Sequence, residues 1–174
     1  MSMAIATQMS VEEYLRTSFD PDCEYVDGEL LERNVGEKSH SKVQKRLLLW
    51  LGPREAEWGI FVAPEWRFKV TERHYRIPDV TIVAGPEPDE QVLETRPLVC
   101  IEILSPEDRM SRMQKKIADY LTYGVRYVWV LDPRTRQAFV YTDSTMYEVK
   151  DGVLRTENPT IEIPLDKIFD EISE

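Results

Sequence analysis

The clearest pattern of apolar and polar residues lies in the middle of the chain. Val99–Leu104 is a short apolar run, and Arg126–Leu131 is a second one. Between them, Met110–Tyr123 repeats apolar residues at helical spacing, which predicts a helix that buries Met110, Met113, Ile117, Tyr120 and Leu121. Gly124, directly after the helical repeat, is typical of a helix end. A strand, a helix and a strand in this order predict a βαβ unit, with two parallel strands in a sheet covered by helices.

The segments on either side add shorter elements. Ser10 opens a short helix through Leu15, and Asp27-Gly28 is the expected turn of a hairpin over Tyr25–Leu31. A second helix, capped by Ser39 or Ser41, carries Val43, Leu47, Trp50 and Leu51 on one face. Strands are expected within 60–70, interrupted at Pro64, and over 75–77, 79–84, 137–142, 146–149, 153–154 and 161–163.

Two further segments complete the expected architecture. Gly85–Arg96 reads as an exposed loop, within which Gln91–Leu93 could form one helical turn, and Leu165–Phe169 reads as a terminal helical turn. The order of elements predicts an α/β (α+β) fold, with a mixed sheet flanked by helices. At 174 residues, the chain is expected to form one domain over residues 1–174.

Composition narrows the class of protein. The longest apolar runs are far shorter than the roughly 20 residues that a membrane helix needs, so no membrane association is expected. Cys23 and Cys100 have no metal-binding spacing and fit a reducing, cytoplasmic location. The net charge of −10 argues against indiscriminate nucleic-acid binding. Residues 38–76, however, hold nine Lys and Arg against four acids, which indicates either scattered solvated charges or a basic groove.

Two acids and one lysine are the candidate catalytic residues. Glu102 lies inside an apolar strand, where an ionised carboxylate costs several kcal/mol unless it is paired or bound to metal. Asp79, after Pro78, begins another strand, and two carboxylates can hold Mg²⁺. A nearby lysine can orient or deprotonate water. At about 100° per helical residue, Lys116 lies at the border of the buried face and Lys115 in solvent.

The spelling and order of these motifs resemble a known family. The segments are YRIPDVTIV from residue 75, LVCIEILSP from residue 98 and KIADYLTYGVRYVWVLDP from residue 116, preceded by EYVDGEL from residue 24 and by Ser39-His40. Together, over roughly residues 10–150, they resemble the Uma-type restriction endonuclease family of the PD-(D/E)XK nuclease superfamily.

The resemblance implies a restriction-endonuclease-like fold, an Mg²⁺ ion for which Mn²⁺ can substitute, and DNA as substrate. Asp79 takes the PD position and Glu102 the (D/E) position, and both are expected metal ligands. Leu104 stands where the superfamily has its lysine. The resemblance therefore points to Lys116 as the catalytic lysine, with Asp79, Glu102 and Lys116 as the catalytic set.

Other residues have two readings each. Glu65 could be a third acid at the metal or a strand residue of no fixed direction. His40 could contact phosphate or lie at the border of the core. Arg67, Lys69 and Arg76 could bind DNA, or belong to a solvated hairpin.

The sequence thus predicts a metal-dependent DNA endonuclease, expected to act as a homodimer since two-fold dimers are the commonest assembly. The alternative is a catalytically inactive nuclease-fold protein that binds DNA or serves in assembly. RNA or branched DNA as the substrate also stays open.

Overall fold

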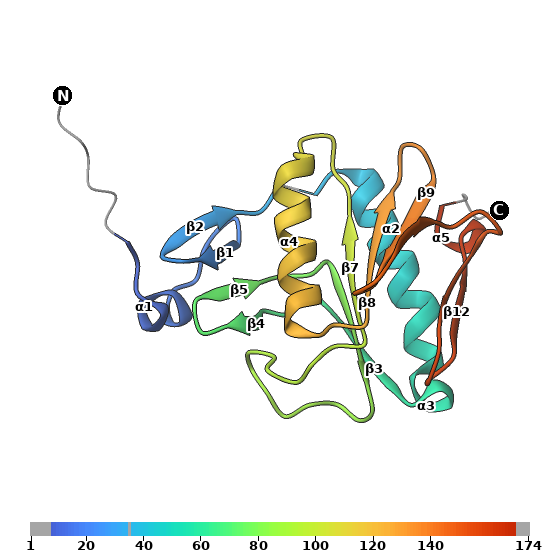
Figure 1. Ribbon diagram of the computed structural model, residues 1–174, viewed down its shortest axis with the longest axis horizontal. Coiled ribbons are helices and arrows are strands. Elements are labelled where there is room, and N and C mark those ends of the chain that lie inside the picture. Colours follow the sequence, from blue (N-terminus) through green and yellow to red (C-terminus); the bar gives the residue numbers. More distant parts are fainter. Residues whose placement is uncertain (1–7, 35, 170–174) are drawn as a thin grey trace.

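A six-stranded mixed sheet forms the centre of the computed structural model, which describes residues 8–34 and 36–169 (Figure 1). Only β7 and β8 run parallel, as predicted for the βαβ unit, and the other neighbours are antiparallel. In spatial order the strands are β10 (Met146–Glu148), β9 (Gln137–Tyr141), β8 (Tyr127–Asp132), β7 (Val99–Ile103), β6 (Val80–Ala84) and β3 (Ile60–Pro64).

Alternation along β7 divides the core into two layers. Val99, Ile101 and Ile103 face α2 (Lys38–Leu51), whose Val43, Leu47 and Leu51 are buried against them. Cys100 faces the other way and packs with Met113, Ile117 and Tyr120 of α4 (Met110–Tyr123). Successive side chains of a strand point to opposite faces, so Glu102 falls on the α4 side. The prediction of a helix on each side of the central strands is confirmed.

A second, four-stranded sheet lies beside the first. Its order is β2 (Glu29–Glu32), β1 (Cys23–Val26), β5 (His74–Arg76) and β4 (Phe68–Thr71). Asp27 and Gly28 both have positive φ, which is the geometry of the predicted Asp-Gly hairpin turn. The helix α1 (Val11–Arg16) is capped by Ser10 as expected, and its Tyr14 packs with Tyr25 and Tyr75. Helix α4 contacts β4 of this sheet and β8 of the larger one, and so joins the two.

The C-terminal elements cover the α2 side. The hairpin of β11 (Val153–Thr156) and β12 (Ile161–Pro164), together with α5 (Asp166–Phe169), buries Leu154, Ile161, Ile163 and Ile168 in the same cluster as α2. The short helices η1 (Gly52–Arg54) and α3 (Glu55–Trp58) connect α2 to β3. No helix in the described part of the chain combines the length and the apolar character that crossing a membrane requires.

Three local predictions differ from the structure. Helix α2 begins before Ser39 and Ser41, with Glu37 at its N-cap, because Lys38 already adopts helical geometry. Gln91–Leu93 is not helical, and Leu93 instead forms a parallel bridge with Phe68. Met110, assigned to the buried face of α4, is 61% exposed. The prediction of one domain includes residues outside the described ranges and stays a prediction.

Candidate active site

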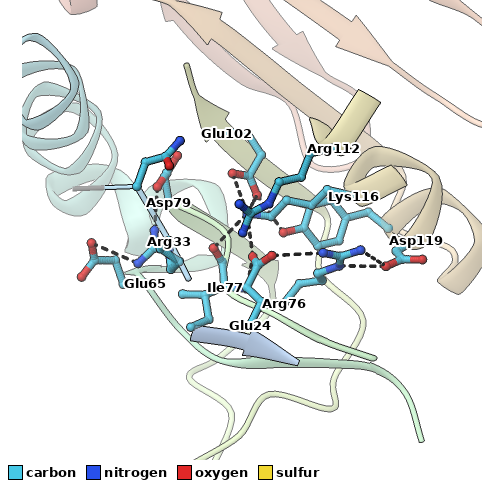
Figure 2. Close-up of polar contacts among 12 residues, drawn as sticks. Glu24, Arg33, Glu65, Arg76, Ile77, Asp79, Glu102, Arg112, Lys116 and Asp119 are labelled. Atoms are coloured by element: carbon cyan, nitrogen blue, oxygen red, sulfur yellow. Dashed lines mark hydrogen bonds and ion pairs between the residues drawn. The ribbon is translucent and has the colours of Figure 1, made fainter. Parts of the chain in front are cut away.

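A cavity of about 60 Å³ opens where both sheets meet α4. Figure 2 shows the polar contacts among residues in and around it. The cavity brings together four residues predicted for the site, which are Asp79, Glu102, Lys116 and His40. Asp79 directly precedes β6, Glu102 lies in β7, Lys116 in α4 and His40 in α2. The other charged residues that line the cavity are Glu24, Arg33, Asp108, Arg109 and Arg112.

Glu102 points from β7 toward α4 and is 3% exposed. Its carboxylate lies 2.9 Å from Nζ of Lys116 and accepts a hydrogen bond of 2.7 Å from the hydroxyl of Tyr120. Burial raises the pKa of Glu102 to about 7, and the neighbouring carboxylates of Asp79 and Glu24 also raise it, against the lowering effect of Lys116. Glu102 is therefore the acid of the site that takes up a proton most readily.

Lys116 is shared between two carboxylates. Its Nζ lies 2.7 Å from Oε1 of Glu24 and 2.9 Å from Oε1 of Glu102, and it donates to the carbonyl oxygen of Ile77 at 3.4 Å. Burial lowers the pKa of Lys116, but the carboxylates of Glu102 and Glu24 outweigh burial and raise it above the ordinary value. The lysine therefore keeps its charge. It lies on the buried face of α4 rather than at the border, whereas Lys115 is exposed as predicted.

Asp79 is surrounded by hydrogen-bond donors. Its Oδ1 accepts from Nη2 of Arg33 at 2.8 Å and lies 3.2 Å from Nε2 of His40, while its Oδ2 accepts from the backbone N–H of Ile103 at 2.7 Å. Burial raises the pKa of Asp79, but His40, Lys116 and Arg33 outweigh burial and lower it. Asp79 is consequently ionised, and its carboxylate is fixed beside β7.

Glu24 and Arg33 also belong to the site, although the sequence analysis assigned them no role. Glu24, 2% exposed, accepts from the backbone N–H of Ile77 at 2.9 Å and pairs with Lys116 and Arg76. Glu24 lies inside the strand Cys23–Val26, so the argument applied to Glu102, that an acid within a buried strand needs a partner, could also have identified Glu24. Arg33 follows directly after β2, where no local pattern marks it.

Arg76 lies inside the protein and not in the cavity. Its guanidinium is 3.1 Å from Glu24 and 2.6 Å from Asp119, and the residue is 3% exposed. These contacts make it the counterion of Glu24, which fixes the carboxylate that holds Lys116. Because its donors are occupied and buried, the structure offers no support for the expected contact of Arg76 with DNA.

The other predicted contacts lie farther out. Neither Arg67 nor Lys69 lines the cavity. Arg67 stacks its guanidinium over the ring of Tyr14, and Lys69 pairs with Glu72 at 3.0 Å. Glu65 is half-exposed and reaches Arg33 at 3.4 Å from outside the cavity. A role of these three residues in substrate or metal binding stays a prediction.

The donor chemistry fits a hard divalent ion. Within residues 8–34 and 36–169, no three His, Cys, Asp or Glu side chains group together as a metal centre. Asp79 and Glu102 nevertheless line one cavity, and Mg²⁺ usually takes one or two protein carboxylates and completes its shell with water and substrate. Both carboxylates are paired with cations, which would have to share or yield the oxygens to a bound ion.

Comparisons with known proteins bear on the family and the fold. Residues 11–166 match the model of the Uma2 family, described as "Putative restriction endonuclease". A crystal structure at 1.96 Å resolution of a "putative nuclease belonging to DUF820" from Anabaena variabilis superposes with a TM-score of 0.80 at 20% identity, over 92% of this chain and 97% of that chain. A DrdV–DNA complex superposes with a TM-score of only 0.38 at 20% identity, over 63% of this chain and 12% of that chain. No curated protein matches the sequence significantly.

Proposed function

Because this chain belongs to the Uma2 family of restriction endonuclease-like proteins, we propose that it is a metal-dependent endonuclease that hydrolyses phosphodiester bonds in DNA. The observation that supports this proposal best is the meeting of Asp79, Glu102 and Lys116 in one cavity from three separate elements. In this proposal Asp79 and Glu102 hold Mg²⁺ or Mn²⁺. When bound, the ion supplies a Lewis acid that polarises the phosphate and acidifies a water.

Lys116 acts through its charge. A lysine whose pKa is raised by two carboxylates is a poor proton acceptor at neutral pH. In this proposal Lys116 therefore orients the attacking water and does not deprotonate it. Its ammonium group also opposes the negative charge that develops on the phosphate during hydrolysis. Glu24 and the N–H donors around it hold the lysine in this position.

The rim of the cavity suggests where the phosphate backbone lies. Arg109, the N-cap residue of α4, and Arg112, in its first turn, line the cavity and are exposed, unlike Arg76. Arginine matches the geometry of phosphate oxygens with two donors at once. We therefore place the flanking phosphates at these arginines. Cleavage of both strands of a duplex would require two copies of the site, which favours a homodimer.

The rival proposal is a DNA-binding or assembly protein that has kept the fold but not the activity. One observation favours it: Glu24, Asp79 and Glu102 each have a cationic partner without any ion. Leu104 in place of the usual lysine agrees with this reading.

A cleavage assay separates the two proposals. Plasmid, single-stranded DNA and RNA are incubated with Mg²⁺ or Mn²⁺ and the wild type, Lys116→Met, Lys115→Met or Asp79→Asn. We expect Lys116→Met to lose about 10²-fold or more in rate, which is typical of a positioned catalytic group, and Lys115→Met to lose little. Circular dichroism establishes that the variants are folded.

Three results would speak against the proposal or parts of it. Cleavage that survives in Asp79→Asn arises from a contaminant or from another site. Equal losses in both lysine variants would remove the special role of Lys116. A wild type that binds DNA but cleaves none of the substrates would favour the rival proposal.

A further inference from the structure

Arg33 occupies Oδ1 of Asp79, one of the two oxygens with which this carboxylate could hold an ion. Its Nη2 donates to Oδ1 of Asp79 at 2.8 Å, while the other oxygen, Oδ2, is bound to the backbone N–H of Ile103. The side chain of Arg33 is 16% exposed and that of Asp79 is 7% exposed, so this pair is largely shielded from solvent. Figure 2 shows Arg33 lying between Asp79 and Glu65.

A divalent ion and Arg33 therefore compete for the same atom. The backbone donor at Oδ2 is fixed by the strand β7, whereas the guanidinium at Oδ1 ends a flexible side chain. Two positive groups a few ångströms apart repel each other strongly where water is scarce. His40 also lies near Oδ1, at 3.2 Å, so Arg33 is one of two groups of the protein beside this oxygen.

Arg33 has a second partner nearer to solvent. Its Nη1 lies 3.4 Å from Glu65, whose side chain is 49% exposed. The guanidinium thus reaches from the buried Asp79 to the rim of the cavity. A guanidinium at such a rim can bind two oxygens of a phosphate with its parallel donors.

From this geometry, and on the basis of the function proposed above, we propose that Arg33 is an exchangeable counterion of Asp79: it gives up Oδ1 to the metal ion and then binds a phosphate of the nucleic acid. Arg33 would thereby couple the binding of the ion to the binding of the substrate. Each group would keep a partner of opposite charge in both arrangements, because the ion replaces the guanidinium at Asp79 and the phosphate replaces Asp79 at the guanidinium.

Isothermal titration calorimetry with Mn²⁺ tests the competition between Arg33 and the ion for Asp79. Arg33→Gln should bind Mn²⁺ about tenfold more tightly than the wild type, since one competing charge close to the ion is gone. Lys115→Gln is the matched control, because it removes one positive charge from the exposed face of α4 at a residue that does not line the cavity, and its affinity should equal that of the wild type. Asp79→Asn shows how much of the heat comes from this site. An affinity of Arg33→Gln equal to that of the wild type would overturn the inference.

Binding of a duplex oligonucleotide, followed by fluorescence anisotropy in the Lys116→Met background, tests the second half. Arg33→Gln should weaken binding about tenfold or more with Mn²⁺ present and have little effect without it, as expected for loss of a charged hydrogen bond to phosphate. The same loss under both conditions would overturn the exchange.

If Arg33→Gln does not fold, Arg33→Lys replaces it. Lysine keeps the charge but lacks the two parallel donors of a guanidinium. The Mn²⁺ affinity of this variant should therefore stay within a few-fold of the wild type, while its Mn²⁺-dependent DNA binding falls; unchanged DNA binding would overturn the inference.

The failure of this inference can be told apart from the failure of the proposed function. If Mn²⁺ binds at Asp79 in the wild type but no more tightly in Arg33→Gln, only this inference fails. If neither protein binds Mn²⁺, the proposed metal dependence fails together with it.

Discussion

One lysine serves two buried carboxylates in this molecule, and the two acids do not benefit equally. Lys116 and Arg76 together lower the pKa of Glu24 against the effect of burial, whereas Glu102 shares Lys116 and also faces Asp79. Burial therefore dominates at Glu102 and raises its pKa, so its ionised form destabilises the fold.

This imbalance predicts that Glu102→Gln stabilises the protein in a pH-dependent manner. The pKa of Glu102 is about 7 in the folded protein against an ordinary value of 4.5, so the folded state holds its proton more tightly. The stability of the wild type should therefore fall as pH rises from about 4.5 to 7 on account of this group. Glu102→Gln cannot ionise, and its melting temperature relative to the wild type should rise between pH 5 and pH 8.

Differential scanning fluorimetry at both pH values measures this difference. Glu24→Gln is the matched control, because the pKa of Glu24 is lowered and its charge stabilises the fold at neutral pH. We expect this variant to melt below the wild type at pH 8. A Glu102→Gln variant that loses more stability at pH 8 than at pH 5 would instead identify Glu102 as a stabilising partner of Lys116.

At the scale of single elements, most of the correct predictions of helices and strands came from the periodicity of apolar residues in the sequence. The βαβ unit is local in sequence, so its two strands and α4 follow from the apolar pattern alone. The helical angle separated Lys116 from Lys115 correctly, but it could not show where the helix leaves the sheet. For this reason Met110, in the first turn of α4, was wrongly assigned to the buried face.

Two glycines at the ends of helices predict opposite effects of alanine. Gly124 ends α4 with φ of 103°, and a Cβ there would lie 3.0 Å from Nε of Arg96. Gly52 follows α2 with φ of −54°, and a Cβ there would meet no atom within 4 Å. Gly124→Ala should destabilise the protein by about 1 kcal/mol or more, and Gly52→Ala should stabilise it by about 0.4–1 kcal/mol. Urea denaturation measures both, and a loss in Gly52→Ala as large as that in Gly124→Ala would contradict the conformational argument.

At the scale of the whole molecule, the candidate site depends on contacts that no local pattern contains. Glu24 reaches Lys116 because β1 pairs with β5 in the smaller sheet, and β5 leads directly to Asp79. Arg33 reaches Asp79 across 46 positions of sequence. The sequence could identify Asp79, Glu102 and Lys116 because each has a local signature or a family motif. It could not place Glu24, Arg33 and Arg76 around them, since their partners are set by how the two sheets meet at α4.

The response of the entire fold to a metal ion is the last prediction. A ligand that binds only the folded state stabilises it by about 2.7 kcal/mol at a hundred times its Kd. For a chain of 174 residues this corresponds to a rise in melting temperature of about 5–10 °C. Mn²⁺ or Mg²⁺ should produce such a rise in the wild type, and Asp79→Asn should abolish it. Glu65→Gln should retain it, because Glu65 lies outside the cavity and pairs only with Arg33 among the residues of the site. A loss of the rise in Glu65→Gln would make Glu65 a third metal ligand, and an equal rise in Asp79→Asn and the wild type would place the ion elsewhere on this acidic protein.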